Sequence, residues 1–578
     1  MKKKIEQLIK NAIFSAVDAG ELSLFNRARD QFYVDAAKDS KHGDFASTIA
    51  LVIAKPEKKS PHDIAKIIIR RIDDLDNILE KIEIAGPGFI NFFIKDIAER
   101  DALYGVLNEI EVQGANYGRS DIGNGKPVQI EFVSANPTGP LHIGHGRGAA
   151  VGDSLARLLS FAGYDVKKEF YINDFGSQVE SLGNSIYARY ALLSSGRPHG
   201  YYVSPPHGDD FSSGPPEDAP NLYLGEYISD LAQEFKARPE FEKLSEDEKK
   251  LYCREEGIKT MLRQIEDTLS KFGVSFDEWY SERKLYDPKD NLVRAAIDEL
   301  REKGLVFEEG GAVWLRTTRF GDDKDRVLIR NNGQTTYFAS DIAYHRDKFL
   351  RGFKEIIDVW GADHHGYIPR MKAAIQALGH NPDEFNVLLV QLVNLMREGQ
   401  PVKMSKRAGT FVTLEEVMDE VGTDACRFTF LLRRPDSHLD FDLDLVKSQS
   451  SENPVYYVQY AHARLSSVFR QAAEKGIALP PIEQVNLSRL SLPEELAIIK
   501  RLSAFPELVE KAAEAKEPHR LTYYLQELAG ELHSYYFRHK FISDDLELTY
   551  ARMYLVEAVQ QVIKTALNLL GVNAPGSM

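Results

Sequence analysis

The spacing of hydrophobic positions changes along the chain and indicates how it is organised. Residues 1 to about 110 combine helical spacing with short strand-like runs, and in the last run, 84–94, a Gly-Pro-Gly turn precedes alternating apolar positions. The first segment is basic and then apolar, but charged residues interrupt its apolar part, so it fits an amphipathic helix better than a signal peptide. This pattern predicts a small α+β domain over residues 1–112.

A second domain is expected after the polar, glycine-containing stretch 114–125. Residues 127–133 are apolar and β-branched enough for a buried strand. Strand candidates such as 356–360 and 387–393 then alternate with helical patterns, which is typical of parallel βαβ units covered on both faces of the sheet. We therefore expect a Rossmann-like parallel-sheet catalytic domain over residues 117–445, with a helical insertion at about 185–300.

The spacing is helical throughout from about residue 450, with long periodic segments such as 456–471 and 519–541. This predicts an all-α helix bundle over residues 450–578. At 578 residues the chain is too long for one hydrophobic core, and at roughly 150 residues per domain it should form three or four units. The expected fold class is therefore an α/β multidomain protein.

Composition narrows the class of protein further. Hydrophobic residues make up 43% of the chain, yet no window approaches the roughly 18 apolar residues that a membrane span needs, so we expect no membrane association. The only cysteines, Cys253 and Cys426, are far apart and have no zinc-ligand spacing, which argues against a disulfide framework and a structural zinc site. A reducing compartment, the cytoplasm, fits this cysteine usage best.

The formal net charge of −15 would discourage contact with a polyanion if it were spread evenly. Residues 451–578 are close to neutral, however, and can carry local basic patches. The charge distribution therefore permits nucleic-acid binding without demonstrating it.

The strongest chemical signal is the segment 132–145, Phe-Val-Ser-Ala-Asn-Pro-Thr-Gly-Pro-Leu-His-Ile-Gly-His. A strand ends there, a Pro/Gly-rich turn follows, and a helix begins near His142, which makes an anion site from the free N–H groups of the helix N-terminus. His142 and His145 share one helix face and can both point at one phosphate, and Gly144 leaves room for a nucleotide to approach. A single histidine on such a helix would more often be structural. The glycines that follow lack the spacing and the downstream acidic residue of a dinucleotide fingerprint.

A second signal is the turn-rich loop 399–409, which presents Lys403 and Lys406 after a buried strand. Two mobile cations can stabilise the β- and γ-phosphates as pyrophosphate charge develops. Alone, Lys-x-x-Lys is an ordinary solvated surface pattern. Its combination with the histidine segment makes it specific.

Together, His142-Ile-Gly-His145 and Lys403-Met-Ser-Lys406 resemble the signatures of the class I aminoacyl-tRNA synthetases. Other segments resemble the arginyl-tRNA synthetases, of bacterial type, over almost the whole chain. They are His42-Gly-Asp-Phe45, Ala85–Asn91, Ser134–Gly139, Tyr171–Asp174, Tyr337–Ala343, Trp360–Gly366, Asn453–Arg464 and the terminal Leu570–Met578. Arg407, where the wider class commonly has Ser, is familiar in the arginyl enzymes and narrows the assignment.

Arginine as a substrate agrees with the residues, because a planar guanidinium is best bound by carboxylates in bidentate geometry. Asp341 and Asp363 are candidates for this role. The resemblance implies that Asn136, Tyr337 and Asp341 line the amino-acid pocket and that Ser134 contacts the α-amino or carboxylate group. Glu131 is either a ligand or a strand residue, and the choice between Asp363 and Glu131 stays open. A pocket that hydrogen-bonds a polar group needs no editing domain, and no segment is large enough to be one.

The resemblance also implies an ATP site, used with Mg²⁺, and a tRNA site. The ATP site is expected to comprise His142, Gly144, His145, Gly361, His364, Met404 and Ser405. His364 and its neighbour His365 either contact the nucleotide or have a structural role, and both alternatives stay open. The tRNA site is expected to include Tyr456, Tyr460, His462 and Arg464, although at least half of the aromatic side chains there should belong to the bundle core.

The resulting hypothesis is an arginine-tRNA ligase that forms arginyl-adenylate and pyrophosphate and then transfers arginine to the 3'-terminal adenosine of tRNA(Arg). His142, His145, Lys403 and Lys406 are its expected catalytic residues. The expected partners are tRNA(Arg), L-arginine and ATP, with no metal site in the protein and no obligate protein partner. Two alternatives are another nucleotidyltransferase of the same fold and a tRNA-binding protein that has lost catalysis. The helical C-terminal region argues against the first and the intact signatures against the second.

Overall fold

The computed structural model describes residues 1–578 except 24–33, 38, 195–221, 224 and 403–411. The chain divides into two compact units. Unit 1 contains Met1–Gly114, Ala472–Ser503 and Tyr535–Val559, and unit 2 contains Ala115–Gln471, Ala504–Ser534 and Gln560–Met578.

Unit 1 contains a small antiparallel sheet and the helices that cover it. Its elements are α1 (Lys2–Asp18), β1 (Val34–Ala36), β2 (Phe45–Ser47), α2 (Ile49–Glu57), α3 (Pro61–Arg70), β3 (Leu79–Ala85), β4 (Phe89–Ile94), α4 (Asp96–Gln113) and α17 (Pro493–Ser503). The strand order is β1-β2-β4-β3. Buried residues recur every three or four positions on α1 and α3, such as Ile5 and Ile9 or Ile64 and Ile68, and they form the core with the sheet.

Unit 2 contains a five-stranded sheet that is parallel throughout. Its strands are β5 (Pro127–Glu131), β6 (Asp165–Ile172), β7 (Glu278–Ser281), β11 (Glu355–Gly361) and β12 (Phe385–Val390). The order is β12-β11-β5-β6-β7, so the strand order reverses between β5 and β11. In doubly wound folds, ligands bind in the crevice at the carboxyl ends of the strands beside such a reversal. The expected Rossmann-like sheet is thereby confirmed.

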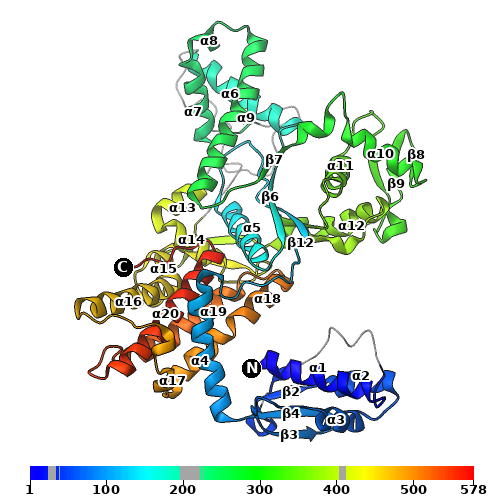
Figure 1. The fold of residues 1–578 in the computed structure, drawn as a ribbon. Helices are drawn as coiled ribbons and strands as arrows, with labels where there is room; N and C mark the ends of the chain where they lie inside the picture. The colour runs from blue at the N-terminus through cyan, green and yellow to red at the C-terminus, as the bar shows by residue number, and fades with distance from the viewer. Residues whose placement is uncertain (24–33, 38, 195–221, 224, 403–411) are drawn as a thin grey trace. The chain divides into compact units, whose positions relative to one another are not determined.

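Helices cover both faces of this sheet. In Figure 1, α5 (Ile143–Phe161) lies along the strands, and it packs so closely that a Cβ at Gly152 would lie 2.2 Å from the ring of Phe132. The opposite face is covered by α11 (Tyr337–Leu350), whose Tyr344 packs on Tyr171 of β6. Side chains of β5 alternate between the two helices, so Glu131 faces α11 and bonds to Lys348 there.

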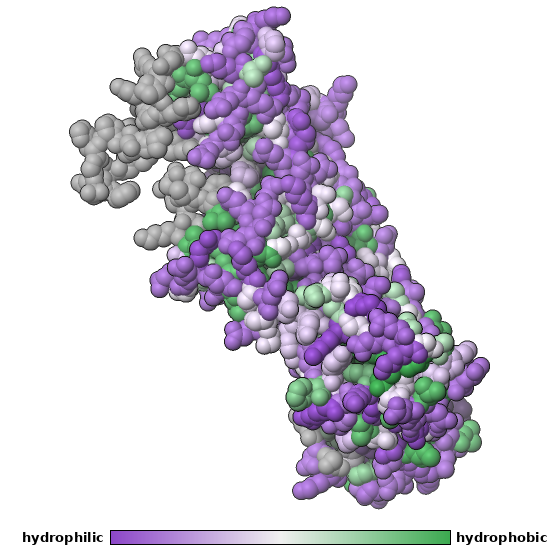
Figure 2. Space-filling view, turned by 90° about the vertical axis from the view of Figure 1, so that its left-hand side faces the viewer, coloured by the Kyte–Doolittle hydropathy of each residue, from purple (hydrophilic) through white to green (hydrophobic). Residues whose placement is uncertain are grey.

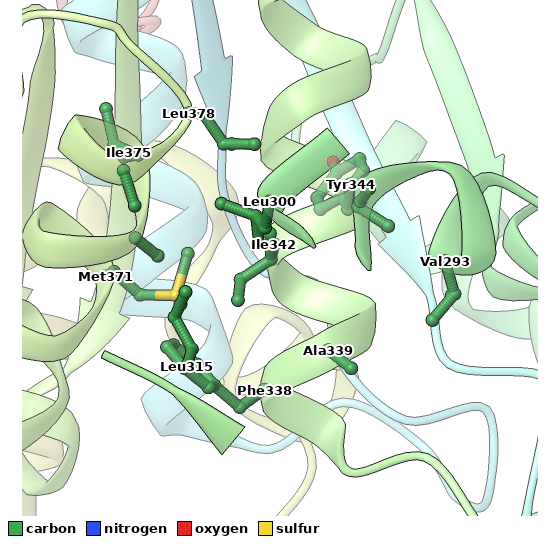
Figure 3. Packing of buried hydrophobic residues seen from close by; sticks show 14 of the residues in the cluster. Val293, Leu300, Leu315, Phe338, Ala339, Ile342, Tyr344, Met371, Ile375 and Leu378 are labelled. Carbon is green, nitrogen blue, oxygen red and sulfur yellow. The ribbon is translucent and has the colours of Figure 1, made fainter. Parts of the chain in front are cut away.

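A hydrophobic cluster packs against the side of α11 that is turned away from the five-stranded sheet. It is formed with α10 (Leu292–Glu302), α12 (Ile368–Ala377) and a small antiparallel sheet of β8 (Val306–Glu309), β9 (Ala312–Leu315) and β10 (Arg326–Ile329). Figure 3 shows Met371 of α12 and Leu378, directly after α12, facing Ile342 of α11 and Leu300 of α10. This packing fixes the face of α11 that is turned toward the sheet.

The remaining elements follow the same chain order. They are α6 (Ser177–Ser194), α7 (Glu226–Lys236), α8 (Pro239–Glu242), α9 (Glu246–Lys271), β13 (Val393–Arg397), β14 (Gln400–Pro401), α13 (Leu414–Val421), α14 (Thr423–Phe430), β15 (Leu439–Asp442), α15 (Leu443–Lys447), α16 (Pro454–Glu474), α18 (Phe505–Ala515), α19 (Arg520–Arg538) and α20 (Leu546–Leu569). Strand β13 pairs with β14 and, in parallel, with β15. Residues of α16, α19 and α20 are shared between the two units. From α16 onward the described chain is helical, as expected for the end of the sequence.

The surface drawn in Figure 2 is mostly hydrophilic, with small hydrophobic patches. No helix in the described ranges is long and apolar enough to cross a membrane. The described side chains form no group of three or more His, Cys, Asp or Glu that could hold a metal ion. Cys253 and Cys426 are both buried free thiols.

A buried ion pair joins α5 to α14 and to the end of α20. The Arg427 guanidinium donates to Asp153 at 2.7 Å, to the carbonyl of Leu570 at 3.1 Å and to the carbonyl of Phe272 at 3.0 Å. Neither charged side chain is exposed. Removing Arg427 leaves the two carbonyls without this donor and leaves the buried Asp153 paired only with Arg157 and Lys168, which are more exposed.

We therefore expect Arg427→Met to lower the free energy of unfolding by about 3 kcal/mol, measured by denaturant titration. Arg157→Met is the matched control, because Arg157 bonds to the same Asp153 at 2.7 Å but is about one-third exposed. It should cost under about 1 kcal/mol. Equal losses in the two variants would contradict the special weight given to the buried guanidinium.

Candidate active site

The turn that follows β5 has an unusual backbone. Val133 and Ser134 have φ values of +69° and +37°, in the left-handed region that costs a side-chain-bearing residue about 1–3 kcal/mol. The Ser134 hydroxyl accepts a hydrogen bond from the Tyr171 N–H at 3.1 Å and donates one to Glu131 Oε1 at 2.9 Å. Tertiary contacts therefore hold a strained turn at the switch point of the sheet.

The two signature histidines cap α5 through one another. Nδ1 of His142 accepts from the Gly144 N–H at 3.1 Å, and Nδ1 of His145 accepts from the His142 N–H at 3.2 Å. The rings are stacked, with centroids 3.7 Å apart. Because both Nδ1 atoms accept, each neutral ring carries its proton on Nε2. A helix N-terminus with two such N–H donors is suited to phosphate oxygens.

The second signature segment, with Lys403, Met404, Ser405 and Lys406, lies outside the described residues, but the chain on both sides of it is described. The N–H of Leu414 donates to the carbonyl of Leu141 at 2.8 Å, and Thr413 pairs with His142 as an antiparallel bridge. The chain leaving the lysine segment is thus joined to the turn that carries the histidines.

Arg147 fixes α5 against the loops around β13. Its guanidinium is fully buried and donates to the carbonyls of Gln391, Arg434 and Ser437 at 2.8 to 2.9 Å. Burial lowers the pKa of Arg147 to about 10, which leaves it charged at neutral pH. The Arg147 side chain therefore ties the histidine helix to the chain segments that precede β13 and β15.

Two carboxyl groups that interact with each other lie directly after β7 and on α11. Glu282, directly after β7, is 3% exposed, and burial together with Asp341 and Asp174 raises its pKa to about 8. Burial also raises the pKa of Asp341, although Tyr367 donates a hydrogen bond to that carboxylate. Within the described ranges neither Glu282 nor Asp341 forms an ion pair. A buried and a partly buried carboxyl group, neither paired with a cation within the described ranges, form a site suited to a cationic ligand.

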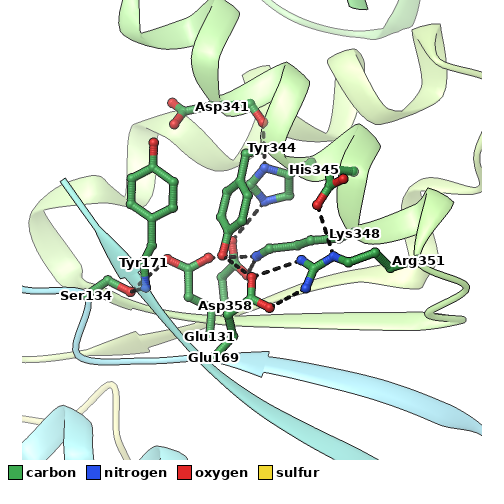
Figure 4. A network of polar contacts seen from close by, with 11 residues as sticks. Glu131, Ser134, Glu169, Tyr171, Asp341, Tyr344, His345, Lys348, Arg351 and Asp358 are labelled. Carbon is green, nitrogen blue, oxygen red and sulfur yellow. Dashed lines mark hydrogen bonds and ion pairs between the residues drawn. The ribbon is translucent and has the colours of Figure 1, made fainter. Parts of the chain in front are cut away.

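Tyr171 lies between the carboxylates and the strained turn. Its hydroxyl hydrogen-bonds Glu282, and burial with the carboxylates of Glu282, Asp341 and Glu131 raises its pKa. Figure 4 shows its ring standing beside Asp341 and Glu131. The amide nitrogen of Asn173 donates to the other side of Glu282 at 2.9 Å. The pocket therefore combines negative charge with fixed donors.

The other residues expected from the sequence are placed differently. Glu131 is bonded to Lys348 at 2.6 Å and so is already paired, whereas Asp363 is 77% exposed and lies 3.6 Å from His364. Gly361 and His364 are exposed at the carboxyl end of β11. Asn136 is exposed in the turn and Tyr337, at the start of α11, is 59% exposed. The structure thus brings Ser134 and Glu131 together with Asp341, but turns Asp363 toward solvent.

Aromatic and basic side chains form a row on α16. The rings of Tyr456 and Tyr460 stack with centroids 5.9 Å apart, and the Arg464 guanidinium lies 5.1 Å from the Tyr460 ring centroid. His462 points inward instead: it is 5% exposed and bonds to the carbonyl of Pro575 at 2.8 Å. Burial lowers the pKa of His462, which favours its neutral form.

Sequence reasoning missed Glu282, Tyr171 and Lys348 as parts of this site. Glu282 follows a short strand and resembles an ordinary helix-start carboxylate, so only the parallel pairing of Tyr171 with Tyr280 brings it into the pocket. Lys348 had a detectable signal, because Asp341, His345 and Lys348 recur at helical spacing on one face of α11.

In this parallel sheet the strand order reverses between β5 and β11, and a helix capped by histidines begins at that point. This is the arrangement of a class I tRNA synthetase catalytic domain. A family model with that description, "tRNA synthetases class I (R), catalytic domain", matches residues 106–190 and 223–430. Models for the arginyl tRNA synthetase N terminal domain and the DALR anticodon binding domain match residues 3–94 and 458–578. The chain belongs to the arginyl-tRNA synthetase family.

Individual relatives agree over the full length. The arginine-tRNA ligase of Citrifermentans bemidjiense is 50% identical over 548 residues, which is 94% of each chain. That of Syntrophotalea carbinolica is 49% identical over 581 residues and covers 100% of each chain. The solved arginyl-tRNA synthetase of Thermus thermophilus is 23% identical and has the same fold, with a TM-score of 0.71 and 100% of each chain covered.

Proposed function

We propose that this chain is an arginine-tRNA ligase that activates L-arginine with ATP and transfers it to the 3'-terminal adenosine of tRNA(Arg). The observation that carries the arginine assignment is the pair of carboxyl groups of Glu282, which is buried, and Asp341, which is partly buried, without an ion-pair partner in the described ranges. A guanidinium placed between them gains two charge-assisted hydrogen bonds and relieves the repulsion that raises the pKa of Glu282. Tyr171 and Asn173 then hold Glu282 in orientation.

The rest of the substrate extends from the guanidinium site toward α5. Ser134 and Asn136 would contact the α-amino and carboxylate end of arginine, and Tyr337 would cover its side chain. The α-carboxylate attacks the α-phosphorus of ATP, an O–P bond forms, and the bond to the β-phosphate breaks to release pyrophosphate. The Nε2–H groups of His142 and His145 donate to phosphate oxygens as negative charge develops there. Lys403 and Lys406 stabilise the leaving pyrophosphate, with Met404 and Ser405 beside the nucleotide.

Activation requires few further groups. Gly144 leaves room for the nucleotide, and Gly361 and His364 lie at the carboxyl end of β11, where doubly wound folds bind nucleotides. Mg²⁺ would be held mainly by ATP phosphate oxygens rather than by a dedicated protein site. In the second step a ribose hydroxyl of the terminal adenosine, the 2'-hydroxyl by class resemblance, attacks the mixed anhydride and releases AMP.

Each domain expected from the sequence would have its own role. Residues 1–112 would meet the tRNA elbow, residues 117–445 would carry the catalysis, and residues 450–578 would bind the anticodon. Tyr456, Tyr460 and Arg464 offer a stacking row for nucleotide bases, whereas His462 would support α16 from inside. Two buried free thiols fit a reducing, cytoplasmic location.

The test is ATP-dependent charging of total tRNA with labelled arginine, lysine, glutamate or cysteine, with a Lys406→Ala control. Charging with arginine alone, which collapses in the control, supports the proposal. Charging with another amino acid would overturn the pocket assignment, and tRNA binding without any charging would favour a non-catalytic protein.

Arginine affinity should depend on pH through Glu282. Its pKa of about 8 means that the carboxyl is largely protonated at neutral pH before arginine binds, and only the ionised form can pair with the guanidinium. Arginine KM should therefore fall by about eightfold as the pH rises from about 7 to about 8.5, because a proton must leave Glu282 on binding. Steady-state charging across this range measures the effect. Glu282→Gln should show a raised but flat arginine KM, and a wild-type KM that stays flat would contradict the assignment.

A further inference from the structure

We propose that Lys348 is a positioning residue of the arginine site, which acts through Glu131 and Ser134 on the strained turn after β5. The inference rests on the proposed function, since it concerns the same site. It assigns a role to a lysine that neither reaches the phosphates nor faces solvent.

Lys348 is a fully buried cation with specific partners. Its side chain is 0% exposed, and Nζ donates to Glu131 Oε2 at 2.6 Å and to Asp358 Oδ1 at 2.9 Å. Nζ also lies 4.3 Å from the centroid of the Tyr344 ring. Burial would lower the pKa of Lys348, but Asp358 and Glu131 outweigh it and raise that pKa, so the ammonium persists. Figure 4 shows this lysine at the centre of the network that joins α11 to β5 and β11.

A histidine also bonds to the carboxylate of Asp358. His345 lies one turn before Lys348 on α11, and its Nε2 faces Asp358 Oδ2 at 2.9 Å. Its Nδ1 faces the carbonyl oxygen of Asp341 at 2.8 Å. Both ring nitrogens thus meet oxygen acceptors, so the ring is held in place between α11 and β11. Asp358 is therefore bonded to both Lys348 and His345, which fixes the carboxylate beside Lys348.

The chain of contacts continues from Lys348 to the turn. Lys348 holds one oxygen of Glu131, and the other oxygen accepts from the Ser134 hydroxyl at 2.9 Å. The same hydroxyl accepts from the Tyr171 N–H. Ser134 and its neighbour Val133 have positive φ values that neither side chain favours. Glu131 can restrain Ser134 only while its own orientation is fixed, and Lys348 fixes it.

This network connects both ends of the arginine site. Asp341, at the guanidinium end, lies seven residues before Lys348 on the same face of α11. Ser134, at the α-amino end, lies on the turn after β5. A buried lysine that bonds Glu131 therefore sets the distance between the two groups that hold opposite ends of one substrate. Small displacements at such distances are costly to rate and affinity.

The test is a double-mutant cycle with Lys348→Met and Ser134→Ala, read as kcat and KM for arginine in tRNA charging. We expect each single variant to lose about 10- to 100-fold in kcat/KM for arginine. The double variant should lose no more than about twice the worse single variant, because both changes break one chain of contacts. The KM for ATP should change by less than about twofold. A general loss of structure would change the KM for ATP as well. Multiplicative losses in the double variant, or an arginine kcat/KM that Lys348→Met leaves unchanged, would overturn the proposal.

Two controls keep the outcome decisive. Lys126→Met removes a lysine that is paired with Glu355 at 2.7 Å on the neighbouring strand, and it should keep kcat/KM for arginine within about twofold of wild type. If Lys348→Met does not fold, the isosteric Glu131→Gln takes its place in the same cycle, with the same expected non-additivity. Failure of the wild-type protein to charge arginine would refute the proposed function. Wild-type charging with a multiplicative cycle would refute only the role of Lys348.

Discussion

Asp341→Asn and Glu282→Gln are each expected to lower kcat/KM for arginine by about 100- to 1,000-fold. Each change is isosteric and removes one of the two carboxyl groups that can pair with the guanidinium, neither of which forms an ion pair within the described ranges. Loss of one member of a desolvated, hydrogen-bonded ion pair costs about 3–4 kcal/mol, which corresponds to that factor. The loss should appear mainly in KM, because the guanidinium is bound in the same way before and during adenylate formation. Steady-state charging at varied arginine concentration measures it.

Asp363→Asn is the matched control for these two variants. It is the same substitution at a carboxylate that the sequence also favours as an arginine ligand, but the structure leaves it 77% exposed. We expect a loss of less than about threefold, since an exposed pair contributes little. A loss in Asp363→Asn as large as that in Asp341→Asn would contradict the placement of the guanidinium site.

His142→Asn is expected to lower the rate of adenylate formation by about 100- to 1,000-fold with little change in arginine KM. The asparagine amide can occupy the position of Nδ1 and accept from the Gly144 N–H, so the helix cap survives while the Nε2–H donor is lost. Removing one donor to charge that develops in a transition state costs about 2.7–4 kcal/mol. Single-turnover formation of arginyl-adenylate in the presence of tRNA measures this step.

His142→Gln provides the opposite comparison at the same position. Its longer side chain can place an N–H near the former Nε2 position but no longer caps the helix well. It should retain more of the rate than His142→Asn and lose more stability on heating. The reverse order, with His142→Asn nearly as fast as wild type, would mean that the histidine acts only as a cap.

Local sequence signals predicted the parts of the site that lie on one continuous segment. The strand, turn and helix of 127–161 carry their own periodicity, glycines and capping groups, so the position of His142 and His145 at a helix N-terminus could be predicted directly. The helical end of the chain was predicted for the same reason. The strand order could not be predicted in this way, because β5 pairs with β11 across more than 220 residues of intervening chain.

The carboxylates of the pocket illustrate the limit of such reasoning. Asp341 was predicted, but its partner Glu282 enters the pocket only because β7 joins the edge of the sheet beside β6. Asp363 follows a central strand, as a site residue should, yet the 3-10 turn Ala362–Tyr367 directs it to solvent. Glu131 was left open between ligand and strand residue, and its bond to a buried lysine settles its geometry. Long-range packing decided the cases of Glu282 and Glu131, whereas a local turn that was not predicted decided the case of Asp363.

The most direct test of the account compares arginine with citrulline as substrates of the wild-type protein. Citrulline has nearly the same shape but replaces the guanidinium by a neutral ureido group, which cannot form an ion pair with Asp341 or with ionised Glu282. Because a polar site rejects an analogue that leaves its groups unpaired, kcat/KM should be at least about 1,000-fold higher for arginine. Charging of tRNA with citrulline within about tenfold of arginine would contradict the claim that the carboxylates of Glu282 and Asp341 select the guanidinium.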